Sequence, residues 1–120
     1  MHLLLIEDDP ALQTTLQRSL VRAAMRVDVC GDGETGLKQA RGGDYDALVV
    51  DRMLPGMDGL ELVETLRRRA VSLPALLITT QPTRQVRLRA QQAGVGIVEK
   101  PLLSSSLGDA VARLLTPSTP

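Results

Sequence analysis

Residues 47–59, ALVVDRMLPGMDG, place a run of apolar residues directly before an aspartate and a turn. Residues 47–50 have the length and the β-branched content of a buried strand, and Asp51 stands where that strand ends. The Pro–Gly and Asp–Gly pairs that follow favour a turn before the next element. The stretch therefore predicts a buried strand that carries one acidic side chain to the edge of a sheet.

The rest of the chain alternates strand-like and helix-like segments. Further short apolar runs occupy residues 3–6, 27–30, 75–78 and 97–98. Apolar residues at helical spacing lie between or after them, at Leu12, Leu16 and Leu20, at Leu60, Val63 and Leu66, and at Leu107, Val111 and Leu114. Residues 34–40 and 83–93 are weaker helix predictions because they are polar. Strict alternation predicts a doubly wound α/β domain, with five parallel strands and helices on both faces.

Composition narrows the classes of function. The chain has 120 residues, which is the size of one domain, and it has neither a membrane-spanning run nor the apolar core of a signal peptide, so we expect a cytoplasmic protein. Cys30 is the only cysteine and is expected in a buried strand. The 14 basic and 14 acidic residues balance, and Tyr45 is the only aromatic residue, so we expect no direct binding of nucleic acid and no membrane partner.

Polar residues gather where the predicted strands end. They are Glu7, Asp8 and Asp9 after the first strand, Asp51 after the third, Thr79 and Thr80 after the fourth, and Glu99 and Lys100 after the fifth. The carboxyl ends of parallel strands share one edge of a sheet, which is where open α/β sheets bind ligands. Two carboxylates about 5 Å apart repel by roughly 3 kcal/mol at an effective dielectric constant of about 20, so a cation is expected there.

The acids and the lysine together indicate phosphoryl transfer. Oxygen ligands without a nearby histidine or cysteine suit Mg²⁺, with Mn²⁺ as an alternative. Lys100 adds a second positive charge, and the central Asp51 is the natural acceptor of a phosphoryl group.

At these motifs the sequence resembles the receiver domain of bacterial two-component response regulators. The resemblance rests on LLLIEDD at 3–9, VVDRMLPGMDG at 49–59, LLIT at 76–79 and EKP at 99–101, in the family's order, and it covers residues 3–115. It implies the flavodoxin-like strand order 2-1-3-4-5, for which a chemotaxis receiver is a known example. It also implies a receiver domain over 1–116, with 117–120 as a tail or the start of a linker.

The resemblance assigns a role to each site residue. Asp51 would be the phospho-acceptor, Asp8 a direct Mg²⁺ ligand, and Glu7 a ligand through water. The backbone carbonyl of Met53 would be a further ligand, and Lys100 would pair with the phosphate. The domain would be a signalling module that assists its own phosphorylation and dephosphorylation, without a turnover substrate.

The resemblance also implies a switch. Thr79 would turn its hydroxyl onto the phosphoryl group, and the Lys100–Pro101 bond would be cis. Ile97 stands where receivers usually carry Tyr or Phe, so any coupling at this position must use an aliphatic side chain.

The implied partner is a sensor histidine kinase or a histidine phosphotransfer protein. By the same resemblance it would dock on the first helix, at Ala11, Thr14, Thr15 and Arg18, and on the loop after Lys100. The output would pass to a downstream protein, or to an effector domain that this chain lacks.

Three other interpretations were weighed. A haloacid dehalogenase-type phosphatase needs a second aspartate two residues after the nucleophile, where this chain has Met53. A flavodoxin-like electron carrier needs a phosphate loop and aromatic residues, whereas this chain has Glu7 and Asp8 after the first strand. The remaining alternative is a pseudo-receiver that binds a protein partner through the Ile97 face without phosphorylation.

Overall fold

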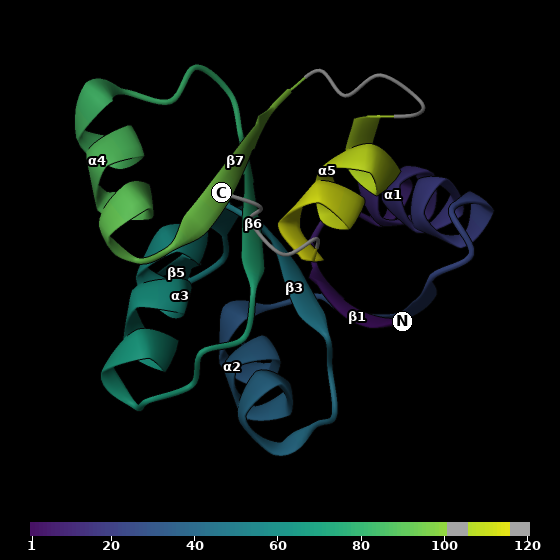
Figure 1. Ribbon diagram of the computed structural model, residues 1–120, viewed down its shortest axis with the longest axis horizontal. Coiled ribbons are helices and arrows are strands. Elements are labelled where there is room, and N and C mark those ends of the chain that lie inside the picture. The colour runs from purple at the N-terminus through teal and green to yellow at the C-terminus, as the bar shows by residue number, and fades with distance from the viewer. Residues whose placement is uncertain (101–105, 116–120) are drawn as a thin grey trace, which may run out of the picture.

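The computed structural model describes residues 1–100 and 106–115, which form a parallel sheet between two layers of helices (Figure 1). The sheet has five strands in the order β2-β1-β3-β6-β7, and every neighbouring pair is parallel. Their bounds are β1 His2–Ile6, β2 Arg26–Cys30, β3 Ala47–Asp51, β6 Ala75–Thr79 and β7 Val95–Glu99. The predicted fold class and strand order are confirmed, and the apolar runs are the strand interiors.

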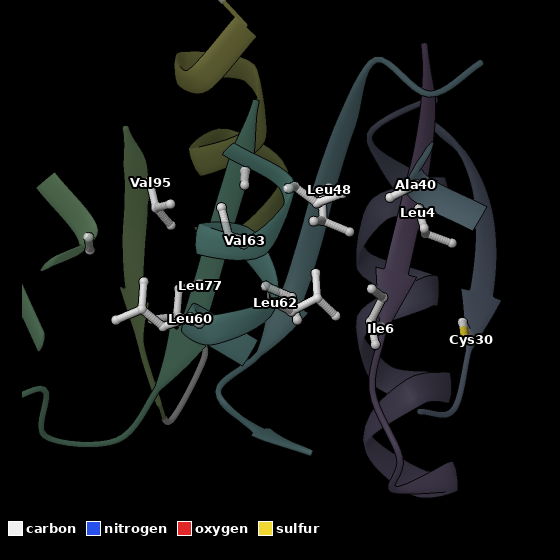
Figure 2. Close-up of a cluster of buried hydrophobic side chains, with 14 of the residues drawn as sticks. Leu4, Ile6, Cys30, Ala40, Leu48, Leu60, Leu62, Val63, Leu77 and Val95 are labelled. Carbon is white, nitrogen blue, oxygen red and sulfur yellow. The ribbon is translucent and has the colours of Figure 1, made fainter. Parts of the chain in front are cut away.

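Five helices cover the sheet: α1 Pro10–Arg22, α2 Gly33–Gly42, α3 Gly59–Arg68, α4 Arg84–Gln92 and α5 Ser106–Leu115. Side chains of α1 and α5 form one core with one face of the sheet, and side chains of α2, α3 and α4 form the other core, shown in Figure 2. The strand residues alternate between these cores, Leu4 and Ile6 facing one and Leu3 and Leu5 the other. None of the helices in the described ranges is both long enough and apolar enough to cross a lipid bilayer.

Polar side chains cap the N-termini of three helices that follow strands of the sheet. Asp9 accepts a hydrogen bond from the Ala11 N–H at the start of α1, and Asp32 does the same for the Thr35 N–H in α2. Thr83 caps α4 through the Val86 N–H. The two polar segments, which were weak helix predictions, therefore form helices α2 and α4.

A short hairpin follows Asp51, where the sequence predicts only a turn. Its strands β4 Met53–Leu54 and β5 Met57–Asp58 are antiparallel, and Gly56, with φ of 72°, lies in the connection. Asp58 then joins the hairpin to α3, because its carboxylate accepts from the Leu60 N–H at 2.8 Å and from Arg52 Nε at 3.2 Å. The hairpin thus fixes the distance between the end of β3 and the start of α3.

Gly59 allows α3 to begin directly against the backbone of Asp51. The Gly59 N–H donates to the Arg52 carbonyl at 2.7 Å. A Cβ atom at Gly59 would lie 2.1 Å from the Asp51 carbonyl oxygen and 3.0 Å from Arg52 Cα. These contacts are with backbone atoms that cannot move without displacing the end of β3, so a side chain here would disturb the position of Asp51 itself.

We predict that Gly59→Ala destabilises the protein by at least about 2 kcal/mol, because the added methyl group overlaps backbone atoms. Gly42→Ala is the matched control, since Gly42 also lies in a helix but has no atom within 4 Å of its added Cβ. It should be neutral or stabilising by up to about 1 kcal/mol, because alanine favours helix. Urea denaturation of both variants measures the difference, and equal stabilities would contradict this account of Gly59.

Candidate phospho-acceptor and cation site

Three carboxyl groups meet at the carboxyl ends of the adjacent strands β1 and β3. One oxygen each from Glu7, Asp8 and Asp51 lies within 4.8 Å of the others. Glu7 and Asp51 are 1% and 3% exposed, whereas Asp8 is exposed to solvent. The register of β1 and β3 places Glu7 beside Asp51, since Ile6 pairs with Val50 and each of these two residues is followed by an acid. The predicted acidic cluster is therefore present.

Asp51 forms an ion pair with Lys100, a residue from a distant part of the chain. Lys100 Nζ lies 2.8 Å from Asp51 Oδ2, and the Met53 N–H donates to Oδ1 at 3.0 Å. Burial acts to raise the pKa of Asp51, but the adjacent Glu7 side chain, Lys100 and the Met53 N–H outweigh it, so this pKa lies below its ordinary value. Asp51 is therefore a carboxylate at neutral pH, with Lys100 directly against it.

The pKa of Glu7 is shifted in the opposite direction from that of Asp51. Burial, reinforced by the neighbouring Asp51, raises the pKa of Glu7 from its ordinary value of 4.5 to about 8. Its Oε1 accepts from the Asp9 N–H at 3.1 Å, but its buried Oε2 has no hydrogen-bond partner within the described residues. A buried carboxyl oxygen without a partner costs free energy, and here it belongs to the acidic cluster.

This donor set fits a hard divalent cation. Three carboxyl groups supply oxygen ligands, no histidine or cysteine belongs to this cluster, and the unpaired oxygen of Glu7 is open to a water molecule or a cation. Asp8 is exposed, so part of a coordination shell can be water, as Mg²⁺ prefers.

Two of the acids expected at this edge do not join the cluster. Asp9 caps α1, as an acid directly before Pro10 at a helix start is expected to do. Glu99 pairs with Arg87 of α4, and sequence reasoning did not foresee this ion pair. The sequence signal is the composition of α4, which carries three arginines and packs against β7, the strand that ends at Glu99.

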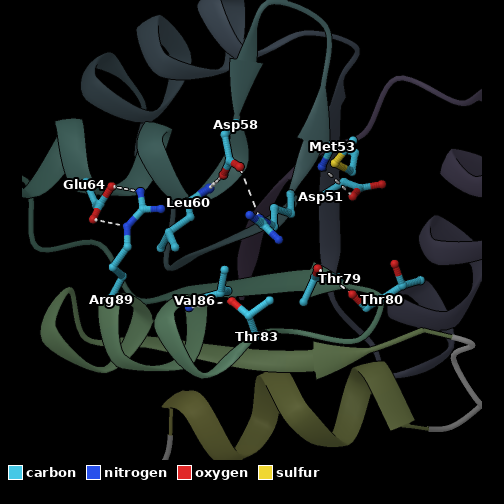
Figure 3. Close-up of polar contacts among 11 residues, drawn as sticks. Asp51, Met53, Asp58, Leu60, Glu64, Thr79, Thr80, Thr83, Val86 and Arg89 are labelled. Atoms are coloured by element: carbon cyan, nitrogen blue, oxygen red, sulfur yellow. Dashed lines mark hydrogen bonds and ion pairs between the residues drawn. The ribbon is translucent and has the colours of Figure 1, made fainter.

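Thr79, Thr80 and Met53 surround Asp51 from neighbouring elements (Figure 3). Thr79 is the last residue of β6, is 4% exposed, and its hydroxyl makes only a long contact of 3.4 Å with the Thr80 carbonyl. Thr80 is exposed, and the Met53 side chain is 73% exposed beside the cluster. Among the residues that the structure describes, the Thr79 hydroxyl therefore has no strong partner that would hold it in place.

Ile97 of β7 and the four predicted docking residues of α1 do not belong to the acidic cluster. Ile97 is half-buried in β7 and packs against the core beneath α2, α3 and α4. Ala11, Thr14, Thr15 and Arg18 are all exposed on α1. A groove of about 350 Å³ adjoins them, lined by Thr14, Gln17, Arg18, Val21 and Arg22. The Lys100–Pro101 bond, the loop after Lys100 and the tail at 117–120 lie outside the described residues.

The amino-acid sequence matches one protein-family model and several characterised regulators. The sequence profile of the family described as "Response regulator receiver domain" matches residues 3–112. Transcriptional regulatory protein TcrA of Mycobacterium tuberculosis is 41% identical over 81 residues, which cover 68% of this chain and 32% of TcrA. Transcriptional activator protein PfeR of Pseudomonas aeruginosa is 44% identical over 87 residues, covering 72% of this chain and 28% of PfeR. The chain thus spans about a third of the length of these relatives.

A solved structure resembles the fold and also carries a metal. It is the receiver domain of the sensor histidine kinase PA1611 from P. aeruginosa PAO1, which has a magnesium ion coordinated in its active site cleft. Its TM-score is 0.83 at 27% identity, and the match covers 95% of this chain and 96% of that one.

The raised pKa of Glu7 predicts a pH-dependent stability without divalent cations. The folded state holds the Glu7 proton up to about pH 8, whereas the unfolded state releases it near pH 4.5. The contribution of Glu7 is therefore fully present below pH 4.5 and is lost as pH rises through about 8, at up to about 1.4 kcal/mol per pH unit. Urea denaturation in a chelator, at about pH 6 and about pH 9, measures this loss.

Glu7→Gln is the control, because glutamine has a similar shape and no proton to release in this range. Its stability should fall less between the two pH values than that of the unaltered protein. Equal falls in both proteins would mean that Glu7 is not the group that titrates.

Proposed function

The chain belongs to the response regulator receiver domains, the phospho-acceptor modules of two-component signalling, and we propose that it accepts a phosphoryl group on Asp51 from a phosphohistidine donor. As a member of this family it is a signalling module and not a turnover enzyme. The observation that carries the proposal is the buried, ionised Asp51 carboxylate, held at 2.8 Å by Lys100 beside two further acids.

Asp51 is suited to attack phosphorus. Its lowered pKa keeps it unprotonated, so one carboxylate oxygen has a free electron pair for the new O–P bond. As that bond forms, the P–N bond to the donor imidazole breaks, and the electron pair leaves with the imidazole nitrogen. The Lys100 ammonium, already at the carboxylate, then lies beside the phosphoryl oxygens and offsets their charge.

The acidic cluster supports binding of Mg²⁺, or of Mn²⁺ in its place. Asp8, Asp51 and the Met53 carbonyl would be direct ligands, and Glu7 a ligand through water. A bound cation would supply positive charge that offsets both the carboxylates and the transferring phosphoryl oxygens. Glu7 would give up its proton when positive charge enters the site, because that charge removes the cost of ionising the buried carboxyl.

Phosphorylation would then be transmitted through Thr79 and the loop before α4. Because the Thr79 hydroxyl makes only a 3.4 Å contact within the described part of the chain, it could turn toward a phosphoryl oxygen. Thr83 caps α4 four residues later, and Arg87 ties the same end of α4 to Glu99, the residue before Lys100. Ile97 packs in the core on this side of the sheet and would adjust with these elements.

The proposed donor is a sensor histidine kinase or a histidine phosphotransfer protein, which would dock on the exposed face of α1. The proposed output is a change in binding to a downstream protein or to an effector domain joined beyond a receiver domain of residues 1–116. The curated relatives, which are transcriptional regulators about three times as long, support an effector domain. We place this exchange in the cytoplasm.

Incubation with a small phosphodonor such as phosphoramidate and Mg²⁺ tests the proposal. Intact-mass spectrometry should show the gain of one phosphoryl group, because Asp51 is ionised and neutralised by Lys100. Asp51→Asn should show no gain, and Lys100→Ala should slow the gain by at least about tenfold, since it removes a charge worth about 1.4 kcal/mol or more in the transition state. Without any gain in the unaltered protein, the phosphorylation-independent binding module becomes the better description.

The docking face is tested by a double substitution, Arg18→Glu with Thr14→Arg. Both residues are exposed and line the groove on α1, so the fold should tolerate the change. We expect phosphotransfer from the cognate phosphohistidine donor to fall by about tenfold or more, while the rate with phosphoramidate stays unchanged. Undiminished transfer from the protein donor would place the docking face elsewhere.

A further inference from the structure

Gln13 of α1 forms hydrogen bonds with the turn after β1, which carries Glu7 and Asp8. Its side-chain Nε2 donates to the Glu7 carbonyl oxygen at 2.5 Å, and its backbone N–H donates to the Asp9 carbonyl at 2.8 Å. Only the amide nitrogen of glutamine can donate to a carbonyl, so the chemistry fixes which way the amide points. One residue therefore binds the two carbonyls on either side of Asp8.

The turn at Asp8 is also held by the hydrogen bond from the Asp9 N–H to Glu7 Oε1 at 3.1 Å. The Glu7 N–H still continues the β1–β2 ladder, donating to the Cys30 carbonyl at 2.9 Å, but β1 itself ends at Ile6. Asp8 is exposed, and within residues 1–100 and 106–115 no hydrogen bond or ion pair is assigned to its side chain. The direction of the Asp8 carboxylate therefore depends on the backbone that Gln13 holds.

The Gln13 side chain is itself confined. It is half-buried, and a Cβ atom at Gly31 would lie 3.8 Å from its Nε2, so the amide packs against the end of β2. Gln17, one helical turn later, is exposed and lies on the groove of α1. Helix α1 thus carries one glutamine, Gln13, that bonds to the Glu7 carbonyl and another, Gln17, that faces the groove.

We propose that Gln13 is a positioning residue for cation binding. By bonding the Glu7 carbonyl it fixes the turn after β1, and so aims the Asp8 carboxylate at Asp51. It does this with a neutral donor, which leaves the charge of the cluster unchanged. The inference rests on the proposed function, since it concerns the affinity of the same site for Mg²⁺.

Mg²⁺ titration of three proteins, followed by amide chemical shifts, tests the inference. They are the unaltered chain, Gln13→Met, and the control Gln17→Met. Methionine matches glutamine in length and helix preference but has no donor. Loss of a group that orients a metal ligand typically weakens metal affinity by at least tenfold, so we expect Gln13→Met to raise the Kd for Mg²⁺ by about tenfold. Gln17→Met should leave the Kd unchanged.

The spectrum of each variant without Mg²⁺ first shows whether that variant is folded. Because the Kd for Mg²⁺ is measured on folded protein, a loss of global stability alone does not change the Kd. Should Gln13→Met fail to fold, Gln13→Asn, whose amide is one methylene too short to reach Glu7, takes its place with the same expected rise. Equal Kd values for the variant and the unaltered chain would overturn the role of Gln13 while leaving the proposed function intact. Absence of Mg²⁺-dependent shifts in the unaltered chain would overturn both.

Discussion

The buried contact between Asp51 and Lys100 is the interaction on which the site depends. Three carboxyl groups lie within 4.8 Å of one another, and in the described ranges one ammonium group, that of Lys100, pairs with them, so full ionisation would leave excess negative charge in a partly buried place. Without a cation the protein relieves this by keeping Glu7 protonated, which is why the pKa values of Glu7 and Asp51 move in opposite directions. The same imbalance makes the site receptive to an added divalent cation, and afterwards to a phosphoryl group that Lys100 can neutralise.

The fold serves this contact by joining parts of the chain 49 residues apart. Asp51 ends β3 at the centre of the sheet, whereas Lys100 follows the edge strand β7, and β6 between them contributes Thr79. The Lys100 N–H extends the ladder by donating to the Thr79 carbonyl at 2.9 Å, so the backbone that carries the lysine is fixed by the sheet itself. On the other side, Gly59 brings the start of α3 against the Asp51 peptide. The position of the acceptor is therefore set by backbone contacts, and the side chains around it supply the charge.

The sequence was sufficient to predict the sheet, its order through the family resemblance, and the meeting of Glu7, Asp8, Asp51 and Lys100, because apolar runs mark strands and parallel strands end at one edge. It did not predict the β4–β5 hairpin, since strands of two residues inside a Pro–Gly turn carry no periodicity. The ion pair of Glu99 was also beyond sequence reasoning, because nothing in the sequence assigns this acid to Arg87 of α4. Asp9 is different, since an acid directly before a proline at a helix start is typical of an N-terminal cap, and Asp9 forms that cap. Gln13 gave no signal because a polar residue beside an apolar helical stripe is ordinarily solvated.

We propose that the acidic cluster accepts a phosphoryl group and passes its effect on to α4. A ¹H,¹⁵N amide spectrum in Mg²⁺, recorded before and after addition of beryllofluoride, which mimics an aspartyl phosphate, tests both steps at once. We expect changes at Asp51, Thr79 and Lys100 that extend through the Thr80–Thr83 loop to Arg87 of α4 and to Ile97 of β7. Absence of any change on adding beryllofluoride would contradict the proposal, and changes confined to the acidic cluster would contradict the transmission to α4.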